Sequence, residues 1–221
     1  MTPAKCALLA IDLQNEYRSG AAWPCVDYEG VLARTAALMA EARAVGVSVI
    51  HVQAWVPPEA RAGCTLQEAT IAPEHRSAVA ESDAAAICAE VAPMAGDLIH
   101  LKRWPSAFRE TALEAKLREM GVEELLVTGV LTDSCVTGTV FDAVYSGLRC
   151  WVVKDCCSSM TEMMHRTGLL NMANRLYGGG ILRQAEALKA LRGEPHRLWR
   201  CTRPVEFPYT AEALDRMYDS L

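Results

Sequence analysis

The amino-acid sequence predicts a three-layer αβα fold with a mostly parallel central sheet of about six strands. Two observations favour this fold class. Short apolar runs of strand length alternate along the chain with segments of helical periodicity, which is the pattern of consecutive βαβ units. The chain has 221 residues, of which 51% are hydrophobic, so it is long enough to bury one substantial core.

The strands are predicted from apolar runs that end at a polar residue or a turn. Cys6–Ile11 is such a run, and Asp12 closes it. Val47–Val52 is rich in β-branched residues, and Asp97–Leu101 is followed directly by Lys102. Three further strands are expected at Leu125–Val130, Cys150–Val153 and Ile181–Leu182.

The helices are predicted where apolar residues recur at every third or fourth position. Gly30–Val45 has this spacing, and Gly46 is expected to stop the helix. Residues 55–86 carry prolines and charges, which is typical of a loop with one short helix. Four further helices are expected at Glu110–Met120, Cys135–Tyr145, Glu162–Leu176 and Ala185–Leu191.

The composition excludes several partners and cofactors. The net charge is −5 and the basic residues form no run, so neither a nucleic acid nor an anionic membrane is an expected partner. No apolar window is long enough to span a bilayer. The nine cysteines are irregularly spaced, which favours free thiols in a reducing, cytoplasmic compartment. The glycines of Tyr177–Ile181 lack the strand–turn–helix context of a dinucleotide site, so no cofactor is expected.

Three reactive side chains follow predicted strands. Asp12 comes after the first strand, Lys102 after the third and Cys135 after the fourth. Because the carboxyl ends of parallel strands meet at one edge of a sheet, we expect these side chains to converge there. An ammonium and a helix N-terminus favour a thiolate, and a carboxylate can pass the thiol proton to a leaving amine. Taken singly, each residue has an ordinary explanation. Asp12 could be a turn former, Lys102 a solvated charge and Cys135 a small core residue.

Three ordered motifs closely resemble those of the isochorismatase-like cysteine hydrolases, which include nicotinamidases and N-carbamoyl amide hydrolases. The motifs are Ala10–Tyr17 (AIDLQNEY), Lys102–Phe108 (KRWPSAF) and Gly129–Val136 (GVLTDSCV). Thr139–Ala143 and Val153–Cys157 match the same pattern, and the resemblance runs from about Cys6 to Leu191. It implies the isochorismatase-like, Rossmann-like form of the αβα fold.

The resemblance also implies a role for each reactive residue. Asp12 is the general base, Lys102 is the cation that lowers the pKa of the thiol, and Cys135 is the nucleophile that forms a thioester. A cis peptide bond is implied between Val130 and Leu131. The backbone N–H groups of Leu131 and Cys135 are then expected to form an oxyanion hole.

Departures from the family pattern limit which metal and which reaction the sequence predicts. Nicotinamidases hold a metal with an Asp-x-His motif after the second strand and a further histidine. Here His51 lies within the strand, no Asp-x-His follows, and His75 and His100 have no partner at ligand spacing, so no metal is expected. Isochorismatases proper cleave a vinyl ether without needing a cysteine, so Cys135 favours hydrolysis of the C–N bond of a small amide or carbamoyl compound. A nicotinamidase, a vinyl ether hydrolase and a non-catalytic binding protein are the alternatives.

The substrate is not identified by the sequence, but aromatic residues near the predicted strand ends are candidates for contacting it. Aromatic side chains at such positions pack under lids as often as they touch a ligand. The five candidates are Tyr17, Trp23, Trp55, Trp104 and Phe108.

The last part of the chain differs from the rest. Residues 1–192 are expected to form the hydrolase domain, and residues 193–221 an extended arm with three prolines and a short terminal helix. The aromatic residues of this arm are typical of an interface, and the family resemblance implies closed oligomers. We therefore expect a homo-oligomer, a dimer or a tetramer, which the arm helps to stabilise. The alternative is that the arm folds back on its own subunit.

Overall fold

The central sheet of the molecule has seven strands in the order β3-β2-β1-β4-β5-β6-β7. The structure is a computed structural model that describes residues 1–57, 72 and 75–221. Strands β1 to β6 run parallel, whereas β7 pairs antiparallel with β6. The strands are β1 (Cys6–Ile11), β2 (Ser48–Ala54), β3 (Leu98–Lys102), β4 (Glu124–Val130), β5 (Arg149–Ser158), β6 (Gly180–Leu182) and β7 (Trp199–Arg200).

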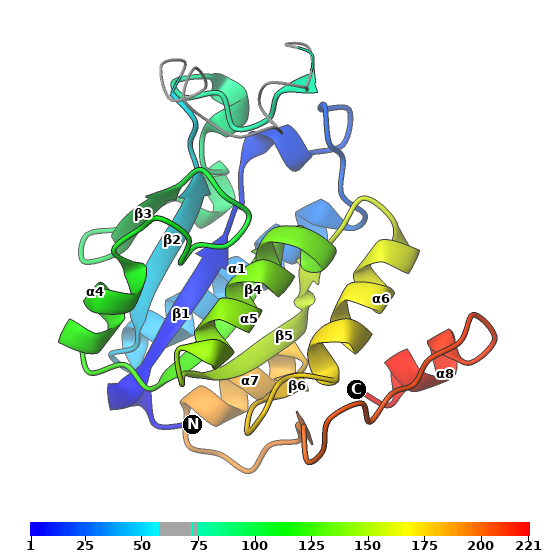
Figure 1. Cartoon of the computed structure of the whole chain (residues 1–221). Helices are drawn as coiled ribbons and strands as arrows, with labels where there is room; N and C mark the ends of the chain where they lie inside the picture. Colours follow the sequence, from blue (N-terminus) through cyan, green and yellow to red (C-terminus); the bar gives the residue numbers. More distant parts are fainter. Residues whose placement is uncertain (58–71, 73–74) are drawn as a thin grey trace.

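Helices cover both faces of the sheet, so the predicted three-layer αβα class is confirmed. Figure 1 shows α5 and α6 on the near face and α1 and α7 behind the sheet. The helices are α1 (Tyr28–Ala44), α4 (Leu113–Glu119), α5 (Thr137–Tyr145), α6 (Glu162–Ala173), α7 (Gln184–Leu191) and α8 (Leu214–Asp219). The predicted ranges overlap these helices, with differences at their ends: α1 begins two residues before the predicted Gly30, α4 and α5 begin later than predicted, and α6 ends three residues before Leu176.

The core lies on the two faces of the central strand β1, all of whose residues are buried. Because side chains alternate along a strand, Ala7, Leu9 and Ile11 join the cluster under α4, α5 and α6. The intervening residues Leu8 and Ala10 join the second cluster under α1 and α7. Apolar runs buried on both faces are what make these strands recognisable in the sequence.

The direction in which the chain adds strands to the sheet reverses between β1 and β4. From β1 the chain proceeds outward through β2 to β3, and from β4 it proceeds the other way through β5 to β6. In open parallel sheets such a switch point leaves a crevice beyond the carboxyl ends of the two strands. Asp12 follows β1 and Cys135 follows β4, so both residues lie beside this crevice.

Two parts of the sheet differ from the prediction. The expected six strands become seven because β7, in the arm, adds two residues at the β6 edge. Strand β5 has ten residues where Cys150–Val153 was expected, and its register against β4 shifts between Val127 and Gly129. Part of the 55–86 segment lies outside the described residues, and the described part includes the short 3₁₀ helix η4 (Asp83–Ala85). A second 3₁₀ helix, η5 (Ala89–Val91), follows the segment.

The arm after residue 192 folds back on its own chain. Cys201, Phe207 and Leu214 are buried in the core cluster that includes α6. The backbone N–H of Phe207 donates to Asn174 Oδ1 at 2.7 Å, and Asn174 Nδ2 donates to the Phe207 carbonyl at 2.9 Å. The aromatic residues of the arm therefore cover their own subunit, as the alternative interpretation stated, and the homo-oligomer stays a prediction.

Helix α8 is held against α6 and β5 by charged side chains around one tyrosine. The Tyr218 ring lies 4.8 Å from Lys154 Nζ and 5.0 Å from the Arg166 guanidinium. Lys154 also donates to the Tyr218 carbonyl at 3.3 Å, and Arg166 pairs with Asp215 at 2.5 Å. In the part of the chain that the structure describes, no helix is both long and apolar enough to cross a membrane.

Candidate active site

Asp12, Lys102 and Cys135 meet at the carboxyl edge of the sheet, as the sequence predicts. Lys102 Nζ lies 2.8 Å from Asp12 Oδ2 and 3.4 Å from Cys135 Sγ, and it donates to the Trp104 carbonyl at 3.1 Å. The side chains of Asp12 and Lys102 are no more than 2% exposed. One ammonium thus bridges a carboxylate and a thiol that are separated by 123 positions in the chain, since 135 − 12 = 123.

Lys102 keeps its charge although it is buried. Burial is the largest influence and disfavours the ammonium, but the Asp12 carboxylate and the Cys135 sulfur outweigh it, so the pKa of Lys102 lies above its ordinary value. An ion pair of this kind compensates in part for the water that both groups lose. Lys102 is therefore positioned to act as a fixed positive charge at the thiol.

A tight turn carries Cys135 away from the end of β4. The Val130–Leu131 peptide bond is cis, as the family resemblance implied. A π-helical turn over Thr132–Val136 follows, and the N–H groups of Ser134 and Val136 both donate to the Leu131 carbonyl at 3.1 Å. The turn places Cys135 before the first residue of α5, which begins at Thr137 rather than at Cys135 as expected.

Two glycines allow this turn to approach its neighbours. Gly129 has a φ of 120°, and a Cβ atom there would lie 2.0 Å from the Ile11 carbonyl oxygen. Gly168 brings α6 against the turn, because a Cβ atom there would lie 2.9 Å from the Asp133 backbone nitrogen. Strand β4 thus packs closely against β1 at Gly129, and the turn that holds Cys135 packs closely against α6 at Gly168. No larger residue fits at either position.

Opposing influences act on the pKa of the Cys135 thiol. Desolvation at the site is the largest influence and, with the Asp12 carboxylate, raises the pKa of the Cys135 thiol to about 12. Lys102 opposes this shift but does not overcome it. Lys102 therefore lowers the pKa of the thiol, as expected, although burial and the Asp12 carboxylate make the net shift upward.

Alkylation by iodoacetamide is expected to reflect this pKa. Cys135 is half-buried, whereas the other seven cysteines that the structure describes are buried, so Cys135 should still be the first of these eight to react. Because the thiolate is the reactive species, its labelling rate should rise about tenfold per pH unit from neutral pH upward. Mass mapping at several pH values measures this dependence. A rate that levels off near neutral pH, or earlier labelling of Cys6, Cys150 or Cys157, contradicts the assignment.

A chain of hydrogen bonds supports the turn from behind and was not foreseen. The Thr132 hydroxyl donates to the Ser158 carbonyl at 2.9 Å, so its oxygen is free to accept from His165 Nδ1 at 2.8 Å. His165 Nε2 then accepts from the Tyr218 hydroxyl at 3.3 Å. Burial lowers the pKa of His165 to about 4, so the ring is neutral at pH 7, as this sequence of donors requires.

The loop after β1 is fixed by Gln14, to which the sequence analysis gave no role. Its side chain is fully buried; Nε2 donates to the carbonyls of Ala54 and Ala85, and Oε1 accepts from the Ala54 N–H at 2.9 Å. Asp12, two residues earlier, has a φ of 51° and donates its backbone N–H to the Val52 carbonyl. The amide of Gln14 therefore ties the Asp12 loop to the end of β2.

Two of the five aromatic candidates lie on the loop after β1. Tyr17 is buried, and burial followed by the charges of Asp12 and Cys135 raises the pKa of its hydroxyl well above the ordinary value. Tyr17 therefore lies within the electrostatic field of the reactive residues. Trp23 is half-buried and lines a separate pocket with Glu16.

The other three aromatic candidates surround the end of β3. The backbone N–H of Trp55 donates to the Lys102 carbonyl at 2.8 Å. The indole N–H of Trp104 donates to Glu110 at 2.9 Å. Phe108 packs against the core cluster under α5. Contact between these side chains and a substrate stays a prediction.

The histidines do not form the metal set of nicotinamidases. His51 Nε2 lies 3.1 Å from Asp97 Oδ2, which also pairs with Arg43, and His100 Nε2 lies 3.0 Å from the Ala107 carbonyl oxygen. Within residues 1–57, 72 and 75–221, no three His, Cys, Asp or Glu side chains gather where they could hold a metal ion. The described residues therefore do not fit that metal centre.

Comparisons with known proteins give the relatives of this chain. The model of the isochorismatase domain matches residues 6–186. The chain is 31% identical to maleamate amidohydrolase of Pseudomonas putida over 191 residues, which cover 85% of this chain and 87% of that protein. It is 29% identical to ureidoacrylate amidohydrolase of Methylobacterium radiotolerans, covering 89% of this chain and 83% of that protein. A cysteine hydrolase structure from Pseudomonas syringae superposes with a TM-score of 0.79 at 19% identity, covering 87% and 95% of the two chains, which supports the fold alone.

Proposed function

Because this chain belongs to the isochorismatase family, we propose that it is an amidohydrolase that cleaves the C–N bond of a small amide or carbamoyl compound through Cys135. The observation that carries the proposal is the position of Lys102, whose ammonium lies within 3.4 Å of the thiol and 2.8 Å of the carboxylate. A nucleophile, a base and a fixed positive charge are the parts that acyl transfer through a thiol needs.

In the proposed first half-reaction, Asp12 accepts the proton of the Cys135 thiol as the sulfur attacks the carbonyl carbon. Because burial and the Asp12 carboxylate raise the pKa of the thiol, this transfer is proposed to accompany the attack. The backbone N–H groups of Leu131 and Cys135 are proposed to stabilise the negative oxygen of the tetrahedral intermediate. The intermediate collapses as Asp12 returns the proton to the leaving nitrogen, and ammonia or an amine departs from a thioester.

In the second half-reaction, water attacks the thioester carbonyl and gives one proton to Asp12. The C–S bond then breaks and the proton returns to the sulfur, which regenerates the thiol and releases the acid product. Throughout both steps Lys102 holds the Asp12 carboxylate in place and stabilises negative charge on the sulfur. No redox partner is needed, because the reaction consumes only substrate and water.

The names of the relatives indicate which compounds to test. One relative is named for maleamate and another for ureidoacrylate, and both compounds combine a carboxylate with an amide or ureido group. An ammonia-release screen over maleamate, ureidoacrylate, nicotinamide, biuret and N-carbamoyl amino acids is expected to give at least one substrate. Hydrolysis of isochorismate with no ammonia from any amide would favour the vinyl ether alternative, and no turnover at all would favour a binding protein.

Activity is expected to survive exhaustive dialysis against a chelator. The reason is that the proposed chemistry runs through a thiol, and His51 and His100 are already engaged in hydrogen bonds. The measurement is ammonia release before and after dialysis, with added zinc, manganese or iron as separate arms. A loss that one of these metals restores would revive the nicotinamidase alternative.

The same proposal includes the compartment, the domain organisation and the assembly of the enzyme. The eight cysteines that the structure describes are all unpaired, which is consistent with the cytoplasm. We keep residues 1–192 as the hydrolase domain, with residues 193–221 as an arm that packs onto it, and a homo-oligomer as its assembly. Exposed Ile99 and Leu101 on the edge strand β3 are consistent with an interface between subunits.

A further inference from the structure

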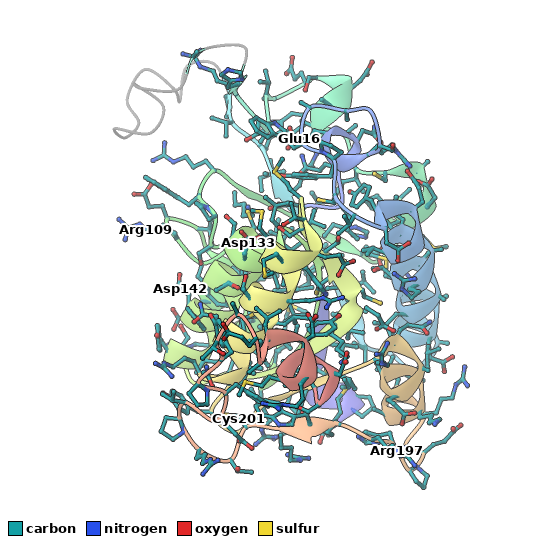
Figure 2. All side chains as sticks on the ribbon, turned by 90° about the vertical axis from the view of Figure 1, so that its right-hand side faces the viewer. Glu16, Arg109, Asp133, Asp142, Arg197 and Cys201 are labelled. Atoms are coloured by element: carbon teal, nitrogen blue, oxygen red, sulfur yellow. The ribbon has the colours of Figure 1, made fainter. Side chains whose placement is uncertain are left out.

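Three side chains connect the C-terminal helix α8 to the turn that holds Cys135. Tyr218 of α8 contacts His165 of α6, and His165 contacts Thr132 at the start of the turn; we call these three side chains the relay. In Figure 2, α8 (red) lies below α6 (yellow), and Asp133 of the turn lies beside the upper part of α6. The match to the isochorismatase domain ends at residue 186, so Tyr218 comes from the segment beyond that match.

The relay ends at a residue that adjoins the proposed oxyanion hole. Thr132 directly follows Leu131, whose backbone N–H is one of the two proposed oxyanion donors. The Thr132 hydroxyl donates to the Ser158 carbonyl at 2.9 Å and lies 2.8 Å from His165 Nδ1. The Thr132 carbonyl accepts from the Thr137 hydroxyl at 2.6 Å, at the first residue of α5. The side chain and the backbone of Thr132 thus both help to fix the turn.

The direction of the Thr132 hydroxyl depends on which ring nitrogen of His165 carries a proton. A carbonyl oxygen only accepts, so a Thr132 hydroxyl that donates to Ser158 has to accept the proton of Nδ1. Nε2 is then unprotonated and accepts from the Tyr218 hydroxyl at 3.3 Å. The other tautomer would leave a lone pair on Nδ1, which would compete with the Ser158 carbonyl for the proton of the Thr132 hydroxyl.

The ring of Tyr218 is held by contacts that do not involve its hydroxyl. It lies 4.8 Å from Lys154 Nζ and 5.0 Å from the Arg166 guanidinium. It also packs against the His165 ring in a T-shaped arrangement, with the centroids 5.9 Å apart. A phenylalanine ring can make the same contacts, because they use only the aromatic system. The hydroxyl can therefore be removed while the packing of α8 is kept.

We propose that Tyr218 is a positioning residue of the active site. Its hydroxyl selects the His165 tautomer that is protonated at Nδ1, and this tautomer holds Thr132. The position of Thr132 in turn fixes the backbone of Leu131 and the turn that holds Cys135. The relay acts by orientation alone and takes no part in the bond changes of the reaction. The inference rests on the proposed amidohydrolase function and assigns part of its geometry to the arm.

Tyr218→Phe tests this role in turnover. We expect kcat for ammonia release to fall at least about threefold with KM as in the wild type, because the oxyanion donors act mainly in the transition state. Tyr209→Phe is the matched control and should keep the wild-type kcat. Tyr209 is a half-buried tyrosine of the same arm, and it also packs against the core. A smaller fall in folded Tyr218→Phe, a change in KM alone, or an equal fall in the control would overturn the proposal.

The tautomer of His165 gives a second readout, which needs no substrate. Burial lowers the pKa of His165 to about 4, so the ring is neutral at pH 7, where ¹⁵N NMR distinguishes a protonated from an unprotonated ring nitrogen. We expect Nδ1 to be protonated in the wild type and Nε2 in a larger fraction of Tyr218→Phe. Among the five histidines, His165 is assigned by the signals that His165→Asn lacks. Protonation at Nε2 in the wild type, or the same tautomer in both proteins, contradicts the selection.

A double-variant cycle tests whether Tyr218 acts through His165. His165→Asn keeps an amide N–H near the position of Nδ1 but has no ring nitrogen that could accept from Tyr218. Adding Tyr218→Phe to His165→Asn should therefore lower kcat by less than it does in the wild-type background. Equal falls in both backgrounds would show that the hydroxyl acts by another route. If the wild type releases ammonia from no amide in the screen, the proposed function fails, while the NMR comparison still decides the tautomer.

Discussion

Replacement of Cys135 by alanine is expected to abolish ammonia release, with kcat lower by about 10⁴-fold or more. The variant retains Asp12, Lys102 and the backbone N–H groups of the turn, but it has no atom that can form the thioester. Loss of the nucleophile in an enzyme whose catalytic groups act as a unit costs nearly the whole rate enhancement above background. The measurement is single-turnover ammonia release on whichever amide the screen identifies.

Cys6→Ala is the control for this variant. Cys6 is also buried, but it lies at the opposite end of β1 from Asp12, so its replacement removes a thiol without touching the site. We expect Cys6→Ala to keep wild-type activity. If Cys135→Ala stays active, the reaction does not pass through a thioester, and the vinyl ether type of chemistry, which needs no cysteine, becomes the better explanation.

Lys102→Met is expected to produce the second largest effect, and on two properties at once. Activity should fall at least about 10²-fold, because the fixed positive charge that faces the sulfur is lost. The free energy of unfolding should also fall, by about 3–5 kcal/mol, because the carboxylate of Asp12 remains buried without its partner. Ammonia release and urea denaturation measure the two effects.

A double variant separates the two effects of Lys102. Asp12→Asn combined with Lys102→Met removes both charges, so the free energy of unfolding should recover while activity stays absent. Arg103→Met is the neighbouring control, since that side chain is exposed and pairs with Glu110 at 2.5 Å. A loss of activity smaller than about tenfold in Lys102→Met, under about 1.4 kcal/mol, would mean that Lys102 is not part of the reactive centre.

The sequence predicts the sheet well where burial is continuous. The runs at Cys6–Ile11 and Leu125–Val130 are apolar throughout because both faces of β1 and β4 are covered. It predicts β5 poorly, since Lys154 interrupts the apolar pattern. That lysine is 2% exposed because the Tyr218 ring and carbonyl, sixty-four positions later, cover it. A distant partner of this kind leaves no local trace in the sequence.

Some features of the candidate site could likewise be predicted from the sequence, and others could not. Convergence of Asp12, Lys102 and Cys135 could be expected from strand order alone, because each lies at or beyond the carboxyl end of a parallel strand. The pKa of Cys135 could not, because desolvation depends on how closely the surrounding loops pack. Glu16 shows the same limit: an acid in a loop is usually solvated, and only the fold reveals that its side chain is buried.

The hydrogen bonds from Tyr218 through His165 to Thr132 connect the last helix of the chain to the turn that holds Cys135. Asp12, Lys102 and Cys135 leave the ribosome in that order, and Tyr218 leaves after all three. Domains fold as their residues emerge, so a nascent chain can assemble its sheet before the turn that holds Cys135 has its rear support. The turn that holds Cys135 therefore gains these contacts only after the C-terminal helix has been synthesised, whereas most of the sheet around it is made first.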